Sequence, residues 1–486
     1  MRKFGALLLL MLLASCGRPV SAPQAEPART VAAVPASAHS DIAAVYAERG
    51  QRALWTTSAA GERLLAMFRR ASSDGLDPAR YRVDEIAAAV RAGDPDALAR
   101  ADLLLSEALV AYARDLRAPA PAVRMTYAEQ GLAPEPLSAA EVLRAGEGVR
   151  SVNPVYDGLR DGFEDYRRRW SPLPQMRLGP APDAATLRQR LGLGTGGFDP
   201  ALAAAVTDFK RAHGLPPDAQ VDAATIAALN RPPAHYEALI RLNMERARGI
   251  PAIEGRFVLV DSAAARLWMF EGARAVDHMR VIVGKPGMST PMLAARLRYA
   301  VLNPYWNVPV DLARQRARAV LRRGTGVLRA ERLQILSQFH AEDRVLSPAS
   351  VNWRAVAAGR EPLRLRQLPG GANVMGAVKF MMPNGLDIYL HDFPDKSLFA
   401  LADRRISSGC VRLEDAPRLA RWLFRGPAPQ PDGPRPEQRV DLPAPVPVYI
   451  TYLTAVPDNG RIHFQRDPDN RDAPLLAALE RERARG

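Results

Sequence analysis

The sequence predicts an α+β protein made of several separately packed units, on three observations. Residues 41–180 carry apolar side chains at helical spacing, residues 183–231 read as a compact group of short helices, and the chain after Pro251 changes to short runs of β-branched and aromatic residues. At 486 residues the chain is longer than one hydrophobic core usually serves, and its hydrophobic content of 48% is ordinary. A disordered or coiled-coil protein is therefore excluded as the overall class.

The first sixteen residues (1–16) read as an export signal. Arg2 and Lys3 precede an apolar run from Phe4 to Leu13, which is too short to span a bilayer as a stable anchor. The Leu-Ala-Ser-Cys segment that ends at Cys16 resembles a bacterial lipobox, in which the cysteine receives a diacylglycerol. The alternative is a plain secretory signal in which Cys16 is incidental. Residues 17–40, rich in Ala and Pro without periodicity, are predicted to be an extended tether.

Residues 41–180, together with 232–250, are predicted to form a helical scaffold domain. Its apolar residues recur at spacings near 3.6, and Pro and Gly mark the breaks between helices. The clearest example is the group Leu103, Leu104, Ala108, Ala111 and Tyr112. No residues with evident catalytic chemistry stand out in this region.

Residues 183–231 are predicted to form three short helices. The apolar positions share one face of the first two helices: Leu187 and Leu191, then Leu202, Ala205, Val206 and Phe209. The second helix ends at Gly214, and the third follows at 223–230. This succession resembles the three-helix peptidoglycan-binding domain. The alternative is a small helical spacer without carbohydrate affinity.

The region 252–455 is predicted to be mostly β. Its strand-like runs are 256–261, 266–270, 279–284, 299–302, 378–382, 386–391 and 446–454. An Arg-rich, helix- and loop-like insertion at 311–367 interrupts them, and an insertion of that size beside a site often acts as a lid. Residues 456–486 are predicted to be a C-terminal tail.

The chemistry is expected at His391 and Cys410. Alternation along 386–391 places Tyr389 and His391 on the face opposite the apolar residues, and alternation after Cys410 places Arg412 on the same side as the thiol. With Cys16 assigned to lipid, Cys410 has no cysteine partner in the chain. Thiol, imidazole and guanidinium are therefore predicted to converge on one cleft.

These residue types suit acyl transfer. A free thiol with a pKa near 8.5 is largely protonated at neutral pH, and an adjacent histidine can take its proton and return it to a leaving amine. The backbone amides of the turn Ser407-Ser408-Gly409-Cys410 are natural donors to an oxyanion, with Ser408 and Gly409 as the named candidates. Arg412 offers a planar fork for a substrate carboxylate.

The segments Tyr389-Leu-His-Asp-Phe-Pro394 and Ile406-Ser-Ser-Gly-Cys-Val-Arg412 resemble the catalytic region of the L,D-transpeptidases, the YkuD-like fold. Ser289-Thr-Pro291, Asn303 to Pro309, Gln367 to Asn373 and Gly376 to Phe380 with Asn384 resemble its large, YcbB-like branch. That branch carries a helical scaffold, a peptidoglycan-binding insert and a capping loop, and the resemblance covers nearly the whole chain past residue 40.

The resemblance implies a thioester acyl-enzyme on Cys410. The donor is a tetrapeptide stem that loses D-alanine, the acceptor is an amine, and the product is a 3-3 crosslink that carbapenems would block. It implies that the backbone carbonyl of Asp392 orients His391, and that Arg412, Ser407, Tyr389 and Asn384 contact substrate. Two positions depart from the family: Ser408 stands where many members have His, so only His391 can serve as base, and Phe393 stands where threonine is common.

Two alternatives stay open. The same acyl-enzyme could pass to water, making an L,D-carboxypeptidase or endopeptidase, or to a protein amine, making a wall-anchoring enzyme. The chain could also be a non-catalytic lipoprotein that ties the membrane to the wall through residues 183–231.

The composition limits the classes of molecule that this protein is expected to bind. The net charge of +14 suits anionic envelope components, but the basic residues are mainly dispersed arginines without a nucleic-acid-binding signature. The remaining histidines lack metal-ligand spacing, so no metal and no cofactor are expected. We expect a monomer on the periplasmic face of the cell envelope, held by its N-terminal lipid. Gly17 is not an aspartate, which favours the outer membrane if the host has two membranes.

Overall fold

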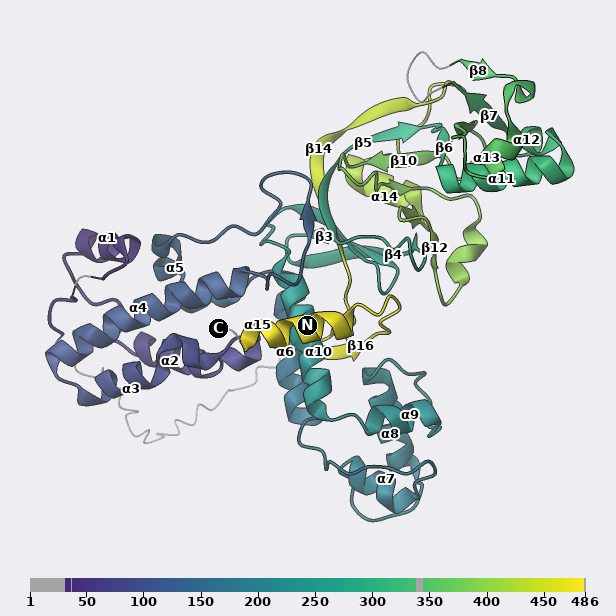
Figure 1. The fold of residues 1–486 in the computed structure, drawn as a ribbon. Coiled ribbons are helices and arrows are strands. Elements are labelled where there is room, and N and C mark those ends of the chain that lie inside the picture. The colour runs from purple at the N-terminus through teal and green to yellow at the C-terminus, as the bar shows by residue number, and fades with distance from the viewer. Residues whose placement is uncertain (1–30, 36, 338–343, 485–486) are drawn as a thin grey trace, which may run out of the picture.

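The computed structural model describes residues 31–35, 37–337 and 344–484. The signal at 1–16, including Cys16, lies outside these residues. Among the helices described, none has both the length and the apolar character needed to cross a membrane. The architecture is mixed, with two helical units and a β-rich unit, which confirms the predicted α+β class (Figure 1).

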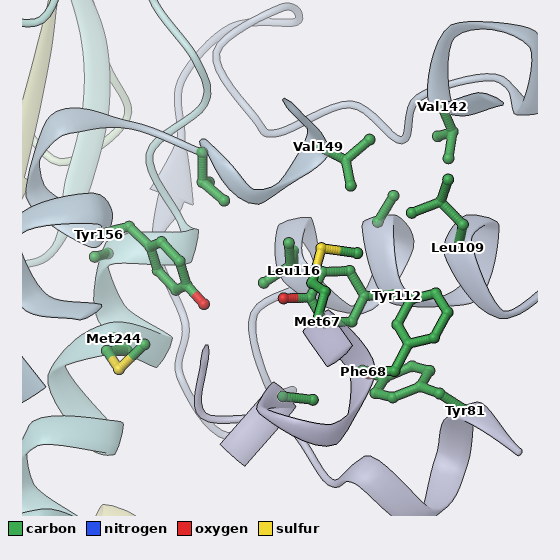
Figure 2. Close-up of a cluster of buried hydrophobic side chains, with 14 of the residues drawn as sticks. Met67, Phe68, Tyr81, Leu109, Tyr112, Leu116, Val142, Val149, Tyr156 and Met244 are labelled. Atoms are coloured by element: carbon green, nitrogen blue, oxygen red, sulfur yellow. The ribbon is translucent and has the colours of Figure 1, made fainter. Parts of the chain in front are cut away.

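The scaffold is a group of helices around one aromatic-rich core. Its helices are α1 (Ser40–Glu48), α2 (Ala60–Arg69), α3 (Val83–Ala92), α4 (Pro95–Arg117), α5 (Ala139–Ala145), α6 (Pro154–Arg169) and α10 (Pro233–Arg248). Phe68, Tyr81 and Tyr112 lie close together in this core (Figure 2), with ring centroids 5.3–5.8 Å apart. Long α4 begins at Pro95, where the Asp94 side chain caps it, and it buries one face along its length.

The predicted three-helix unit is present as α7 (Ala184–Arg190), α8 (Pro200–Ala212) and α9 (Ala223–Leu229). An aspartate caps each helix through a backbone amide of the first turn: Asp183, Asp199 and Asp222. Its small core is separate from the scaffold core and contains Leu187, Leu191, Leu202, Val206 and Phe209.

The β-rich unit is a sheet that closes on itself. Its strands are β1 (Thr126–Tyr127), β2 (Arg256–Asp261), β3 (Arg266–Glu271), β4 (Arg274–Gly284), β5 (Leu293–Leu302), β10 (Val378–Met381), β11 (Leu390–His391), β12 (Arg405–Ser407), β13 (Val411–Leu413) and β14 (Gln438–Thr451). The order is β1-β5-β10-β11-β13-β4-β3-β2-β14, and β14 also pairs with β5. Helix α14 (Ala416–Phe424) packs its buried face on the core inside this ring.

The insertion has a core of its own. It contains the predicted helices α11 (Val310–Arg323), α12 (Gly326–Ala330) and α13 (Trp353–Ala357). It also contains a four-stranded sheet in the order β6-β9-β7-β8, which the sequence did not predict: β6 (Trp306–Val308), β7 (Leu333–Leu336), β8 (Val345–Leu346) and β9 (Leu365–Gln367). Because β6 pairs with β9, the two ends of the insertion lie side by side.

Residues 456–486 were predicted to be a tail, but the described part belongs to a packed hairpin and helix. Strands β15 (Ala455–Asp458) and β16 (Arg461–Phe464) lie against α6, and α15 (Asp472–Arg483) follows. Two glycines of α6 permit this contact, because a Cβ at Gly158 would lie 2.7 Å from Pro457 and one at Gly162 would lie 2.8 Å from Ile462. The sequence pattern missed the hairpin because its partner surface lies some 300 residues earlier in the chain.

Candidate active site

Strands β11 and β13 bring His391, Cys410 and Arg412 to one face of the sheet. The two strands are parallel, with Leu390 opposite Val411 and His391 opposite Arg412. Leu390 and Val411 are fully buried in the core, so alternation places their neighbours on the outer face. Cys410 lies one strand across and two residues back from Arg412, which puts its Cα about 8 Å from that of His391 by strand geometry. Side chains at that separation can meet.

His391 is held in one tautomer. Its Nδ1 lies 2.6 Å from the carbonyl oxygen of Asp392, and because a carbonyl only accepts, Nδ1 carries the proton. The neutral ring then presents an unprotonated Nε2, the form a general base requires. Burial, aided by the Arg412 charge, lowers the pKa of His391 to about 3. The contact predicted between Asp392 and His391 is therefore present, and the imidazole is neutral at physiological pH.

Cys410 rests as a thiol. Burial raises its pKa, and the Asp387 charge adds to this, while Tyr389 and the Arg412 charge act in the opposite direction. The Sγ atom donates to the carbonyl oxygen of Asp387 over 3.6 Å, a contact that only the protonated thiol can make. Tyr389 lies against this sulfur, and its own pKa is raised by burial and by the neighbouring thiol. The resting pair is thus a neutral thiol and a neutral base.

In the turn before Cys410, more polar groups are already hydrogen-bonded within the protein than the sequence predicted. The Ser407 hydroxyl accepts the Gly409 N–H at 3.1 Å and donates to the Cys410 carbonyl at 2.7 Å. Gly409 has φ = 121°, which favours glycine. The Gly409 N–H is therefore already paired with Ser407, and its role as an oxyanion donor stays a prediction. Ser407 is buried and holds the turn, and its predicted contact with substrate stays a prediction.

Asn384 is also used internally. Its side-chain nitrogen donates to the carbonyls of Met382 and Ile388 at 2.6 and 2.7 Å, and its oxygen accepts the N–H groups of Leu386 and Ile388. Both donors and both lone pairs are occupied, so Asn384 shapes this loop, and its predicted role in substrate binding stays a prediction.

The loop that Asn384 shapes is not the regular strand expected over 386–391. Asp387 has φ = 51°, Leu386 is 47% exposed, and the strand begins only at Leu390. This irregular backbone directs the Asp387 carbonyl at Cys410. The sequence did not single out that residue.

Arg412 lies two residues after Cys410, with its guanidinium 4.3 Å from the centre of the Phe393 ring. Its Nε is buried and has no hydrogen-bond partner among the described residues. Burial lowers the pKa of Arg412 from its usual value. A stacked guanidinium with unused donors can bind a carboxylate, as predicted, and the aromatic Phe393 at the position where threonine was expected provides the stacking surface.

Comparison with known proteins agrees with this organisation. The family described as "L,D-transpeptidase catalytic domain" matches residues 255–447, the family described as "Scaffold domain" matches residues 40–169, and the family described as "Putative peptidoglycan binding domain" matches residues 186–229. A protein of Haemophilus influenzae named "Putative L,D-transpeptidase" is 30% identical over 229 residues, which is 46% of each chain. The alignment thus spans less than half of that relative.

Solved structures give weaker matches. An L,D-transpeptidase from Mycobacterium smegmatis is 13% identical over 40% of this chain and 58% of its own, with a TM-score of 0.19. An L,D-transpeptidase from Xylanimonas cellulosilytica is 17% identical over 57% of this chain and 98% of its own, with a TM-score of 0.17. The family matches and the relative carry the assignment: the chain contains a YkuD-type L,D-transpeptidase catalytic domain together with a scaffold domain and a peptidoglycan-binding domain.

Proposed function

We propose that this protein is an L,D-transpeptidase that remodels peptidoglycan, with Cys410 as nucleophile and His391 as general base. The observation that carries the proposal is the hydrogen bond from His391 Nδ1 to the Asp392 carbonyl, which leaves Nε2 unprotonated on the face that Cys410 shares. The match of residues 255–447 to the catalytic domain supports the same chemistry.

The first half-reaction makes a thioester. The thiol leaves its contact with the Asp387 carbonyl and transfers its proton to His391 Nε2, while the sulfur attacks the carbonyl carbon between the L-centre of the third residue and the fourth, D-residue. The tetrahedral intermediate collapses, and the protonated imidazole returns its proton to the departing D-alanine amine. Arg412 binds a stem carboxylate and fixes the peptide over the sulfur.

The second half-reaction moves the acyl group to an amine. In a wall that contains meso-diaminopimelate, the acceptor is the side-chain amine of another stem. Its nitrogen attacks the thioester, its proton passes to His391, and the thiolate leaves and is reprotonated. The product is a 3-3 crosslink, and Cys410 is restored.

The same proposal includes the location. The segment 1–16 and its Cys16 support attachment to the membrane by lipid, on the periplasmic face, and the domain at 186–229 supports contact with the wall. Metabolic labelling with a radioactive fatty acid is expected to mark the full-length protein but not a Cys16→Ala variant. Labelling that persists in the variant would exclude Cys16 as the acylated residue.

Intact-mass spectrometry tests the chemistry. A protein lacking residues 1–16 is incubated with a carbapenem and, separately, with purified disaccharide-tetrapeptide, alongside Cys410→Ala. We expect a carbapenem adduct and a crosslinked dimer, both absent from the variant. Hydrolysis without dimer would make the enzyme a carboxypeptidase, and the absence of any reaction that depends on Cys410 would leave a wall-binding lipoprotein.

A further inference from the structure

Thr290 connects the catalytic turn to the sheet beneath it. The residue is 1% exposed and lies in the short connection between β4 and β5. Its hydroxyl accepts the N–H of Gly284 at 2.9 Å and lies 2.7 Å from the carbonyl oxygen of Gly409. Because the amide must donate and the carbonyl must accept, the single hydroxyl proton points to Gly409.

The position of Thr290 is itself fixed by close packing. A Cβ on Gly284 would lie 2.1 Å from the Met288 carbonyl oxygen and 2.6 Å from the Thr290 nitrogen. Only glycine at 284 lets the connection fold back tightly enough to place the hydroxyl under the turn. The contact therefore joins residues that are 119 positions apart in the sequence through backbone that has little room to move.

The hydrogen bond to the Gly409 carbonyl also sets the direction of the Cys410 N–H. The peptide unit is planar and trans, so its C=O and N–H point in opposite directions. With the carbonyl held toward buried Thr290, the Cys410 N–H points away from Thr290. This N–H donates to no acceptor among the described residues, whereas the Gly409 N–H is taken by Ser407.

We propose that Thr290 is a positioning residue for the oxyanion site: it locks the Gly409–Cys410 peptide so that the Cys410 N–H donates to the negative oxygen of the tetrahedral intermediate. The inference rests on the proposed acyl transfer. Gly409, at φ = 121°, is free to rotate its following peptide when the lock is lost. The rotated carbonyl would then face the developing oxyanion and repel it.

Two reactions of Cys410 distinguish a positioning role of Thr290 at the oxyanion site from a role in stabilising the fold. Acylation by a carbapenem passes through an oxyanion, whereas alkylation by iodoacetamide requires only a reactive sulfur. Thr290→Val keeps the shape but removes the hydroxyl. We expect carbapenem acylation to slow on the order of 100-fold, the loss typical for removing an oxyanion donor, while alkylation changes less than about twofold. Thr290→Ser is expected to restore acylation.

Controls make each outcome decisive. Thr207→Val, in α8, repeats the same exchange at a hydroxyl that bonds only to Ala203 of its own helix, and is expected to leave both rates unchanged. If Thr290→Val does not fold, Thr290→Ala, which also lacks the hydroxyl, takes its place and should show the same selective loss of acylation. Equal loss of both reactions, or loss of neither, would overturn the role of Thr290. A wild-type protein that alkylates but is never acylated would instead overturn the proposed function.

Discussion

In the resting state the Cys410 thiol and the His391 imidazole are both uncharged, and this determines how the rate of the proposed reaction depends on pH. Burial lowers the pKa of His391 to about 3 and raises that of Cys410. Above about pH 3 the imidazole of His391 is unprotonated, and below its raised pKa Cys410 is a thiol. Papain-like enzymes differ, because there the paired cysteine has a depressed pKa.

We therefore expect the rate of carbapenem acylation to be nearly constant from pH 5 through neutral pH and to rise only in the alkaline range, where thiolate forms. Stopped-flow measurements across this range, on enzyme checked for folding at each pH, give the profile. A fall in rate with a midpoint near 6.5 would contradict it, since that is the ordinary pKa of a histidine in contact with water.

Arg412 combines two functions that different substitutions can separate. Its charge lowers the pKa of Cys410, and its stacked fork is free to bind a carboxylate. Arg412→Met is expected to slow iodoacetamide alkylation at pH 8 several-fold and to raise KM for the tetrapeptide. Arg412→Lys, which keeps the charge but not the planar fork, should restore alkylation and leave KM high. Restoration of both by lysine would show that charge alone matters.

Helix α8 is attached to the scaffold through His213, which has an aromatic ring on nearly every side. The imidazole stacks on Phe209 at 3.9 Å and lies 4.5 Å from Tyr236, and it also contacts Phe464 of β16. Its Nδ1 donates to the Phe209 carbonyl at 2.8 Å, and burial lowers its pKa to about 3. The peptidoglycan-binding domain is thus docked on the scaffold.

This docking predicts loss of stability in acid. The unfolded pKa of histidine is about 6.5, so between that value and about 3 the unfolded state binds more protons than the folded state. The free energy of unfolding therefore falls as pH drops through this range, with a similar contribution from His391. His213→Phe should make the melting temperature depend less steeply on pH between 6.5 and 4. An unchanged slope would show that His213 is not buried as described.

Helices α6 and α10 form the centre of the whole molecule, with the catalytic sheet at one end and the peptidoglycan-binding domain at the other (Figure 1). The scaffold core continues onto the outer face of the sheet through Phe257, Leu259 and Tyr449. Scaffold and catalytic domain therefore share one core, and we expect them to unfold together.

A buried ion pair closes this shared core. Arg246 of α10 is fully buried, and its Nη1 lies 2.8 Å from an oxygen of Asp472 in α15, with the guanidinium over the Tyr452 ring. Asp472→Asn removes the countercharge of this buried cation, leaving its Nη1 with the neutral side chains of Asn243 and Thr454, and is expected to lower the free energy of unfolding by about 3–5 kcal/mol. Urea unfolding followed by circular dichroism measures it. Asp441→Asn, which breaks an exposed pair with Arg439, should change nothing measurable.

Local patterns were sufficient for the scaffold helices, the three short helices and most strands of the catalytic domain, and they singled out His391 and Cys410 as the residues expected to carry the chemistry. Alternation of Leu390 and Val411 with His391 and Cys410 requires only period-two backbone, and the aspartate caps of the three short helices act within three residues. Such signals lie within a few residues of one another and can be read from the sequence.

Contacts between distant segments of the chain decided which hydrogen-bond partner each polar atom of the site has. The Gly409 carbonyl bonds Thr290, 119 positions away, and the C-terminal hairpin finds its surface on α6. Asn384 and Ser407 looked available for substrate because the sequence does not show which donors and acceptors the folded backbone will occupy. A hydrogen-bond partner is chosen by proximity in three dimensions, so chemistry-bearing residues can be predicted from a local pattern, whereas the groups that orient them become known only when the chain is folded.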